Sequence, residues 1–87
     1  MNVCFELYGV ARRHAGQERV PVTAGTVGEA LAALEKMCPA LSGHVVVHGR
    51  LTPHYRLSLN GRSFVSRPEN LLSEGDTLIV LSAAVGG

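Results

Sequence analysis

A single capped amphipathic helix, expected over Val27–Met37, constrains most strongly what this chain can fold into. Thr26 followed three residues later by Glu29 is a capping box, whose side chains satisfy backbone N–H groups at the start of a helix. Pro39 ends the pattern, because the residue before a proline disfavours helical geometry. One apolar stripe runs along the helix at helical spacing: Val27, Ala30, Leu31, Leu34 and Met37. A helix with one apolar face needs a sheet to cover.

Two β-strands are expected before this helix. Residues 3–8 have a period of two, which places three apolar side chains on one face: Val3, Phe5 and Leu7. Residues 17–22 form the second strand, and Pro21 lacks the N–H group that an interior strand donates, so this strand should lie at an edge. Residues 10–15 between them are expected to form a helical turn, and the two strands to pair antiparallel.

Three further strands are expected after the helix. Residues 55–59 and 62–65 flank Asn60-Gly61, which is the strongest short signal for a β-hairpin. Residues 77–82 are almost continuously apolar, which is typical of a central strand buried on both faces. We therefore place the last strand inside the sheet.

Residues 40–53 are the least readable segment. Val45-Val46-Val47 favours a short strand, but the surrounding residues are equally compatible with a turn-rich excursion. Further along, we expect Leu71-Leu72 to tuck under the sheet. One helix between two strand pairs predicts a two-layer α+β domain, with a mixed sheet of four to five strands packed on one main helix. This domain is expected over residues 1–82, followed by a flexible tail over residues 83–87.

Composition limits the classes of function. The chain has 87 residues and a net charge of +1, so nothing in its charge favours binding to nucleic acid. No apolar run approaches the ~20 residues that span a membrane, and the N-terminus does not resemble a signal peptide. We expect a cytoplasmic protein, in which Cys4 and Cys38 stay reduced.

No catalytic or metal-binding constellation stands out in the sequence. The four histidines lack metal-ligand spacing, since His44 and His48 flank three valines that disfavour a helix. No phosphate-binding loop or dinucleotide fingerprint is present, and the serines have no activating partner nearby. We therefore expect a carrier or a non-catalytic subunit, with no metal and no bound cofactor.

The chemistry is expected at the end of the chain. The last strand leads through small residues to Val85-Gly86-Gly87. A Gly-Gly end adds nothing to packing, but its bare backbone is able to thread a narrow channel in another protein. The α-carboxylate of Gly87 is then the reactive group, with Val85 and Gly86 entering the channel before it.

Several motifs, taken in order, resemble the MoaD/ThiS sulfur-carrier family, and most closely the molybdopterin synthase small subunit. They cover nearly the whole chain, with residues 40–53 the weakest stretch: Phe5-Glu-Leu-Tyr-Gly-Val-Ala-Arg12, Thr26-Val-Gly-Glu-Ala-Leu-Ala-Ala-Leu34, Leu59-Asn-Gly-Arg62, Leu72-Ser-Glu-Gly-Asp76 and Val85-Gly-Gly87. The resemblance implies a ubiquitin-like β-grasp fold. One departure concerns the tail, where Ser82-Ala83-Ala84 replace the prolines usual in the molybdopterin branch.

The resemblance also implies a reaction cycle and its partners. An E1-like adenylyltransferase of the MoeB/ThiF type would use ATP to adenylate the carboxylate of Gly87, and sulfur would then replace AMP to give a thiocarboxylate. In the molybdopterin branch the loaded tail enters a large subunit of the MoaE type, within a heterotetramer. Two alternatives stay open: a sulfur carrier for thiamine, cysteine or tRNA thiolation, and a ubiquitin-like protein modifier or interaction module.

A docking face is expected beside the tail. By the same resemblance, Leu78 and Val80 belong to the core, so Ile79 and Leu81 point to the other face of the strand. An exposed apolar patch there, with Phe64 as a further member, would bind the partner. The competing possibility is that residues 40–53 cover this face.

Overall fold

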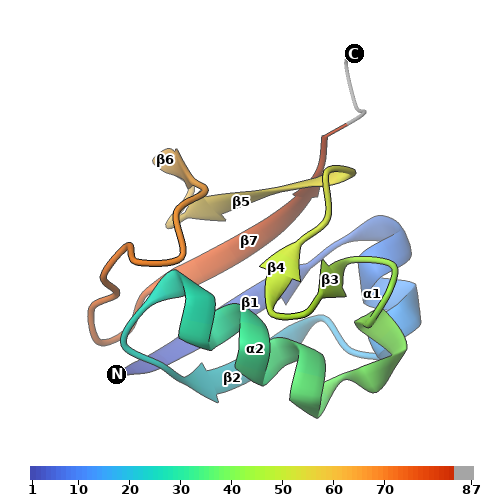
Figure 1. Cartoon of the computed structure of the whole chain (residues 1–87), viewed down its shortest axis with the longest axis horizontal. Helices are drawn as coiled ribbons and strands as arrows, with labels where there is room; N and C mark the ends of the chain where they lie inside the picture. The colour runs from blue at the N-terminus through green and yellow to red at the C-terminus, as the bar shows by residue number, and fades with distance from the viewer. Residues whose placement is uncertain (84–87) are drawn as a thin grey trace.

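A five-stranded mixed sheet forms one layer of the molecule, and one main helix packs across one of its faces (Figure 1). The computed structural model describes residues 1–83. Its elements, in chain order, are β1 (Asn2–Leu7), α1 (Gly9–Ala15), β2 (Arg19–Thr23), α2 (Val27–Met37), the 3₁₀ turn η1 (Pro39–Leu41), β3 (Val46–Val47), β4 (Arg50–Leu51), β5 (Tyr55–Leu59), β6 (Ser63–Val65) and β7 (Thr77–Ser82).

The last strand lies in the middle of the sheet. The strand order is β2-β1-β7-β5-β6, in which β7 runs parallel to β1 and antiparallel to β5. Placement of the last strand inside the sheet is therefore confirmed, and so is the edge position of β2, which carries Pro21. These features, with one helix on one face, give the expected two-layer α+β β-grasp fold.

Helix α2 has the bounds expected from its sequence, and every amide of its first turn is hydrogen-bonded. The amides of Val27 and Gly28 donate to the carbonyls of Asn70 and Pro68, each at 2.9 Å. The Glu29 amide donates to the Thr26 hydroxyl at 3.2 Å. The reciprocal half of the cap is shifted by one residue, since the Glu29 carboxylate accepts from the amide of Gly25, at 2.8 Å. A helix start with no orphan donors is fixed firmly against the loop before β7.

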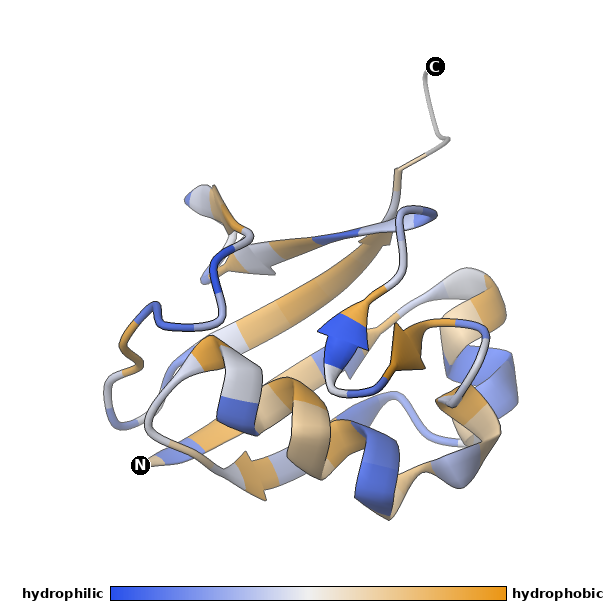
Figure 2. Cartoon of the chain, viewed as in Figure 1, coloured by the Kyte–Doolittle hydropathy of each residue, from blue (hydrophilic) through white to orange (hydrophobic). Residues whose placement is uncertain are grey.

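The core lies between α2 and the inner face of the sheet. Its largest fully buried side chains come from both layers and include Phe5, Leu7, Val27, Leu34, Leu78 and Val80. Figure 2 shows the hydrophobic run of β7 in the centre of the sheet. Assignment of Leu78 and Val80 to the core is confirmed.

Residues 40–53 fold partly as turns and partly as short strands. The expected short strand and the expected turn-rich excursion are therefore each confirmed in part. Strands β3 and β4 form a two-stranded antiparallel sheet that packs against α2. Val45 and Val46 are fully buried there. Because this segment lies on the helix side of the main sheet, it does not cover the opposite face (Figure 1).

Three expectations about burial are wrong. Met37, the last residue of the apolar stripe expected on α2, is 55% exposed. Strand β7 is central but is not buried on both faces, because Ile79 is half-buried and Leu81 exposed on the face that no helix covers. Leu72 is buried, as expected, whereas Leu71 is 81% exposed. Consecutive residues of an extended segment point in opposite directions, so only one of the two leucines reaches the core.

Within residues 1–83, no helix has the length and apolar character needed to cross a membrane.

Replacement of Thr26 by alanine tests the start of α2. Loss of the hydroxyl leaves the Glu29 amide without its partner, and we expect the free energy of unfolding to fall by ~1 kcal/mol. Urea denaturation of the two proteins measures this difference. Thr26→Ser keeps the hydroxyl and serves as the control, and identical unfolding of wild type and Thr26→Ala would contradict the cap.

Candidate functional site

The face of the sheet opposite α2 carries an exposed apolar cluster. Phe64 is 62% exposed, Leu81 is 36% exposed and Ile79 is half-buried. Strand register brings them together, because Ser58 on β5 pairs with Phe64 on one side and with Ile79 on the other. All three line one hollow of about 420 Å³, together with Tyr8, Ser58, Gly61, Arg62 and Ser63. We call this surface the open face, and it unites the three residues predicted for partner binding.

Two contributors to the open face were missed at the level of sequence. Tyr8 follows the end of β1 and is 46% exposed, and Arg62 comes from the tip of the β5–β6 hairpin. The sequence Asn60-Gly61 predicted a hairpin turn at this tip, and both residues have the positive φ that such a turn requires, 57° and 70°. Tyr8 reaches the hollow because β1 pairs in parallel with β7, which local sequence patterns do not reveal.

The charges around the open face are mainly cationic. The Arg56 guanidinium lies over the Phe64 ring, 5.4 Å from its centroid. Glu6 is already paired, because it forms a salt bridge of 2.9 Å with Arg19 and accepts a hydrogen bond of 2.8 Å from the Tyr8 hydroxyl. The hydrogen bond to this carboxylate raises the pKa of Tyr8 above its usual range. An apolar centre with a cationic rim suits a partner surface with apolar and acidic side chains.

The tail leaves the domain from a firmly held base. At the end of β7, Ser82 pairs with Tyr55, and the Ala83 amide donates to the carbonyl of His54 at 2.8 Å. The exposed side chain of Leu81 precedes this point on the open face. Val85, Gly86 and Gly87, for which tail threading and adenylation were predicted, lie outside the described residues.

The other end of β7 is held by a clamp that Asp76 and Asn60 form. The Asp76 carboxylate accepts from the Asn60 side chain at 3.0 Å and from the Ser73 amide at 2.7 Å. Asn60 in turn accepts from the Thr77 amide at 2.8 Å. The hydrogen bond from Asn60, followed by that from Ser73, holds the pKa of Asp76 below its usual range. Thus the β5–β6 hairpin and β7, which together carry the open face, are joined by an ionised side chain.

Other reactive side chains are placed as structural groups. The rings of His14 and His44 stack at 4.6 Å between centroids and join α1 to the turn after η1. Both cysteines are free thiols, and burial raises the pKa of the Cys38 thiol. Among residues 1–83, no three metal-ligating side chains come together.

Comparison with protein families gives one match that spans almost the whole chain. The model of the ThiS family matches residues 5–87, which include the terminal glycines. Among curated proteins, no sequence matches this chain.

Solved structures with this fold come from archaea and bacteria. SAMP1 from Haloferax volcanii, a small archaeal modifier protein, is 28% identical with a TM-score of 0.85, over all of both chains. A chain of the BexX/CysO complex from Amycolatopsis orientalis is 25% identical, with a TM-score of 0.79, over 98% of this chain and 99% of that one. A chain of the complex between subunits 1 and 2 of molybdopterin-converting factor from Helicobacter pylori is 21% identical. Its TM-score is 0.69 over all of both chains, which shows the shared fold.

Replacement of Asp76 by asparagine tests the clamp through its dependence on pH. Since the pKa of Asp76 is lower in the folded state than the ~3.9 of an unfolded aspartate, ionisation stabilises the fold above about pH 4. This stabilisation is lost as the pH falls through the folded-state pKa. We expect Asp76→Asn to be less stable at pH ~7, and the gap to wild type to shrink between pH ~5 and ~2.

Chemical denaturation at several pH values measures this gap. Glu69→Gln, which removes an exposed carboxylate outside the clamp, is the matched control. A gap for Asp76→Asn that stays constant from neutral to acid pH would show that its ionisation does not stabilise the fold.

Proposed function

Because the chain belongs to the ThiS family of ubiquitin-like sulfur carriers and modifiers, which are not themselves enzymes, we propose that it carries sulfur on the carboxylate of Gly87. The observation that carries this proposal is the Gly-Gly end, which follows the central strand after a short connection of residues 83–85. Hydrogen bonds on both sides of β7 hold the base of the tail, and the family match continues to Gly87. A rigid base with a bare end suits delivery of one reactive group into the active sites of other proteins.

The chemistry follows from the weakness of a carboxylate as an electrophile. An oxygen of the Gly87 carboxylate attacks the α-phosphorus of ATP in the active site of an E1-like enzyme, and pyrophosphate leaves. Hydrosulfide, HS⁻, supplied by the partner system then attacks the acyl carbon of the adenylate, and AMP leaves. The product is a thiocarboxylate on Gly87. The carrier itself needs no cofactor for this reaction, since the partner enzyme uses the ATP.

The pathway we propose is molybdenum cofactor biosynthesis, with this chain as the small subunit of molybdopterin synthase. The activating enzyme would be of the MoeB/ThiF type, and the large subunit of the MoaE type, in a heterotetramer. The order of sequence motifs supports this branch, and a chain of the Helicobacter pylori complex shares the fold. The open face is the surface we assign to these partners, with Phe64, Ile79 and Leu81 in contact with them.

A second candidate function is covalent modification of other proteins. It is favoured by the similarity to the Haloferax volcanii modifier protein over the full length of both chains. In that reaction a lysine amine of the target, in place of sulfur, attacks the acyl carbon of Gly87. Tryptic digests of cells that make a tagged form of the chain would then contain branched peptides, in which a lysine of another protein carries the long C-terminal peptide of this chain, since Arg67 is its last basic residue. Their absence, when thiocarboxylate is detected, favours the sulfur carrier.

Changes at the end of the tail test the site of adenylation. Deletion of Gly87, or addition of one residue after it, should abolish ATP–pyrophosphate exchange by the activating enzyme and leave thermal unfolding unchanged. Gly86→Ala should fold normally but react slowly, because its Cβ obstructs a channel shaped for bare backbone. Exchange that persists in the extended protein would refute adenylation at Gly87.

Charged substitutions on the open face test partner docking. Ile79→Glu and Leu81→Glu each place a carboxylate within the apolar cluster, and we expect each to weaken binding to the activating enzyme at least about tenfold. Isothermal titration calorimetry measures the affinity. Met37→Glu is the matched control, because Met37 is 55% exposed on α2 and lies outside the open face. If both variants are folded and bind as tightly as the control, docking occurs elsewhere.

A further inference from the structure

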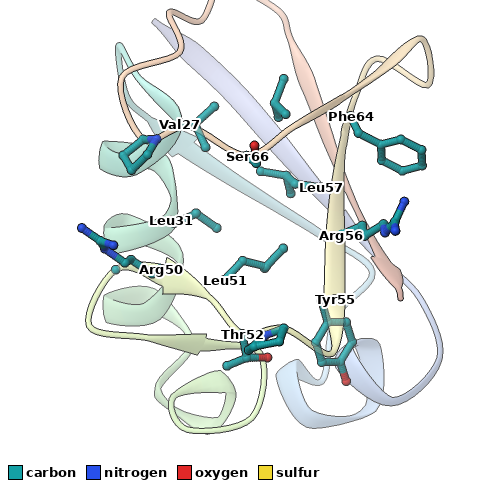
Figure 3. A pocket seen from close by; sticks show the side chains of 14 residues that line it. Val27, Leu31, Arg50, Leu51, Thr52, Tyr55, Arg56, Leu57, Phe64 and Ser66 are labelled. Atoms are coloured by element: carbon teal, nitrogen blue, oxygen red, sulfur yellow. The ribbon is translucent and has the colours of Figure 1, made fainter. Parts of the chain in front are cut away.

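One cation of the open face lies beside the base of the tail. Arg56 on β5 pairs with Leu81 on β7, two residues before Ala83. The Arg56 guanidinium lies over the Phe64 ring, 5.4 Å from its centroid. Figure 3 looks into a hollow of about 510 Å³ beside α2, lined by residues of α2, β4 and the β5–β6 hairpin. Both side chains are directed away from this hollow, toward the open face (Figure 3).

The tail is long enough to bring its carboxylate back to this cation. Four residues, 84–87, follow Ala83, and four residues of an extended chain span at most about 14 Å. Two residues of a strand advance about 7 Å, and paired antiparallel strands lie about 5 Å apart. The backbone of Arg56 is therefore roughly 8 Å from that of Ala83. The side chain at position 56 is thus within reach of the carboxylate of Gly87.

An amine at this position would compete with sulfur transfer. The adenylate of Gly87 has a good leaving group, and a lysine amine is able to attack its acyl carbon. An amide bond would form, AMP would leave, and the proton of the amine would pass to solvent. The product is a ring closed by a stable amide, from which hydrosulfide does not release the carboxyl group. A short tether supplies an effective concentration of the order of millimolar, so this ring closure would be fast relative to the same reaction between two molecules.

Arginine provides the positive charge without the amine. A guanidinium stays protonated in proteins, whereas the ammonium group of a lysine, with a pKa of ~10.4, is in equilibrium with a nucleophilic free amine. The sequence has seven arginines and a single lysine, Lys36. Lys36 is exposed in the last turn of α2, on the helix side of the sheet. Among the described residues, the open face therefore carries its positive charge on arginine alone, at Arg56 and Arg62.

We propose that Arg56 keeps the open face cationic beside the tail and at the same time withholds an amine from the activated carboxylate of Gly87. The positive charge suits a partner surface with acidic side chains. The lack of an amine leaves the acyl group to a nucleophile that the partner supplies. This inference rests on the proposed activation of Gly87, and it goes beyond that activation by assigning a chemical role to Arg56.

A C-terminal thioester tests the proposal without the activating enzyme. Cleavage of an intein fusion by a small thiol gives the full-length chain with a thioester on Gly87, which amines attack as they attack an adenylate. Lys36→Arg is made first, so that each further variant contains one lysine. In this background Arg56→Lys places an amine beside the tail and keeps the charge.

Arg67→Lys in the same background is the matched control. Arg67 is exposed in the loop after β6, and the next residue of this loop, Pro68, accepts a hydrogen bond from Gly28 at the start of α2. Figure 1 shows this loop at the end of the sheet away from the tail. The control therefore adds the same amine, with the same charge, outside the reach of the tail.

We expect the thioester of Arg56→Lys to close into a ring at mildly alkaline pH. The intact mass is then lower than that of the free acid by one water, and hydroxylamine, which cleaves a thioester, leaves the product unchanged. Ring closure should be at least about tenfold faster than in Arg67→Lys, because only the amine at position 56 benefits from the short tether. The thioester of the wild-type chain should form a ring no faster than that of Arg67→Lys.

Three results would overturn the proposal. They are equal rates of ring closure in Arg56→Lys and Arg67→Lys, no ring in either variant, and a ring between Gly87 and Lys36 of the wild type that forms as fast as the ring in Arg56→Lys. ATP–pyrophosphate exchange by the wild-type chain and its activating enzyme tests the activation of Gly87 separately. Absence of exchange would refute the proposed function, whereas the thioester experiment reports on Arg56.

Discussion

The pairing of β7 with strands on both of its sides is the interaction on which the rest of the structure depends. Hydrogen bonds to β1 and to β5 join the two strand pairs into one sheet, and without β7 each pair would be a separate hairpin. The clamp formed by Asp76 and Asn60 fixes where β7 begins, and the bond from the Ala83 amide to His54 fixes where it ends. The strand that precedes the C-terminal glycines is therefore hydrogen-bonded to a neighbouring strand on each side.

The difference in width between one helix and five strands accounts for both surfaces of interest. On one side no helix covers the sheet, so apolar side chains of β6 and β7 remain exposed as the open face. On the other side α2 covers only part of the sheet, which leaves a hollow of about 510 Å³ beside it. The β5–β6 hairpin contributes to both, since Phe64 points to one face and Val65 to the other. One small domain thereby presents two chemically different surfaces.

Much of this arrangement could be predicted from the sequence, because local patterns specify local structure. Thr26, the apolar stripe and Pro39 located α2, and Asn60-Gly61 located the hairpin. The short strands β3 and β4 could not be predicted, since two residues carry no period, and the burial of Val45 and Val46 depends on α2.

The candidate sites divide in the same way. Strand alternation placed Ile79 and Leu81 on one side of the last strand. The resemblance to the sulfur-carrier family assigned that side to the exposed face, with Phe64 as a further member. Tyr8 was missed because only the parallel register of β1 with β7 brings it close to the other residues of the open face. The hollow beside α2 was missed because it depends on the relative widths of the layers. The opposite orientations of Leu71 and Leu72 could not be predicted, because they depend on how the loop lies against α2, where Leu71 forms a β-bridge with Thr26. Sequence patterns thus specify faces and turns, whereas cavities and neighbours across the sheet follow from the assembled fold.

The central claim is that Gly87 carries sulfur, and the mass of the C-terminal peptide tests it most directly. The chain would be incubated with its activating enzyme, ATP and a sulfide source, then digested and analysed by mass spectrometry. The account predicts a C-terminal peptide in which one oxygen of the Gly87 carboxylate is replaced by sulfur, and only when ATP is present. A peptide that keeps an unmodified carboxylate, under conditions in which the enzyme forms the adenylate, would contradict it.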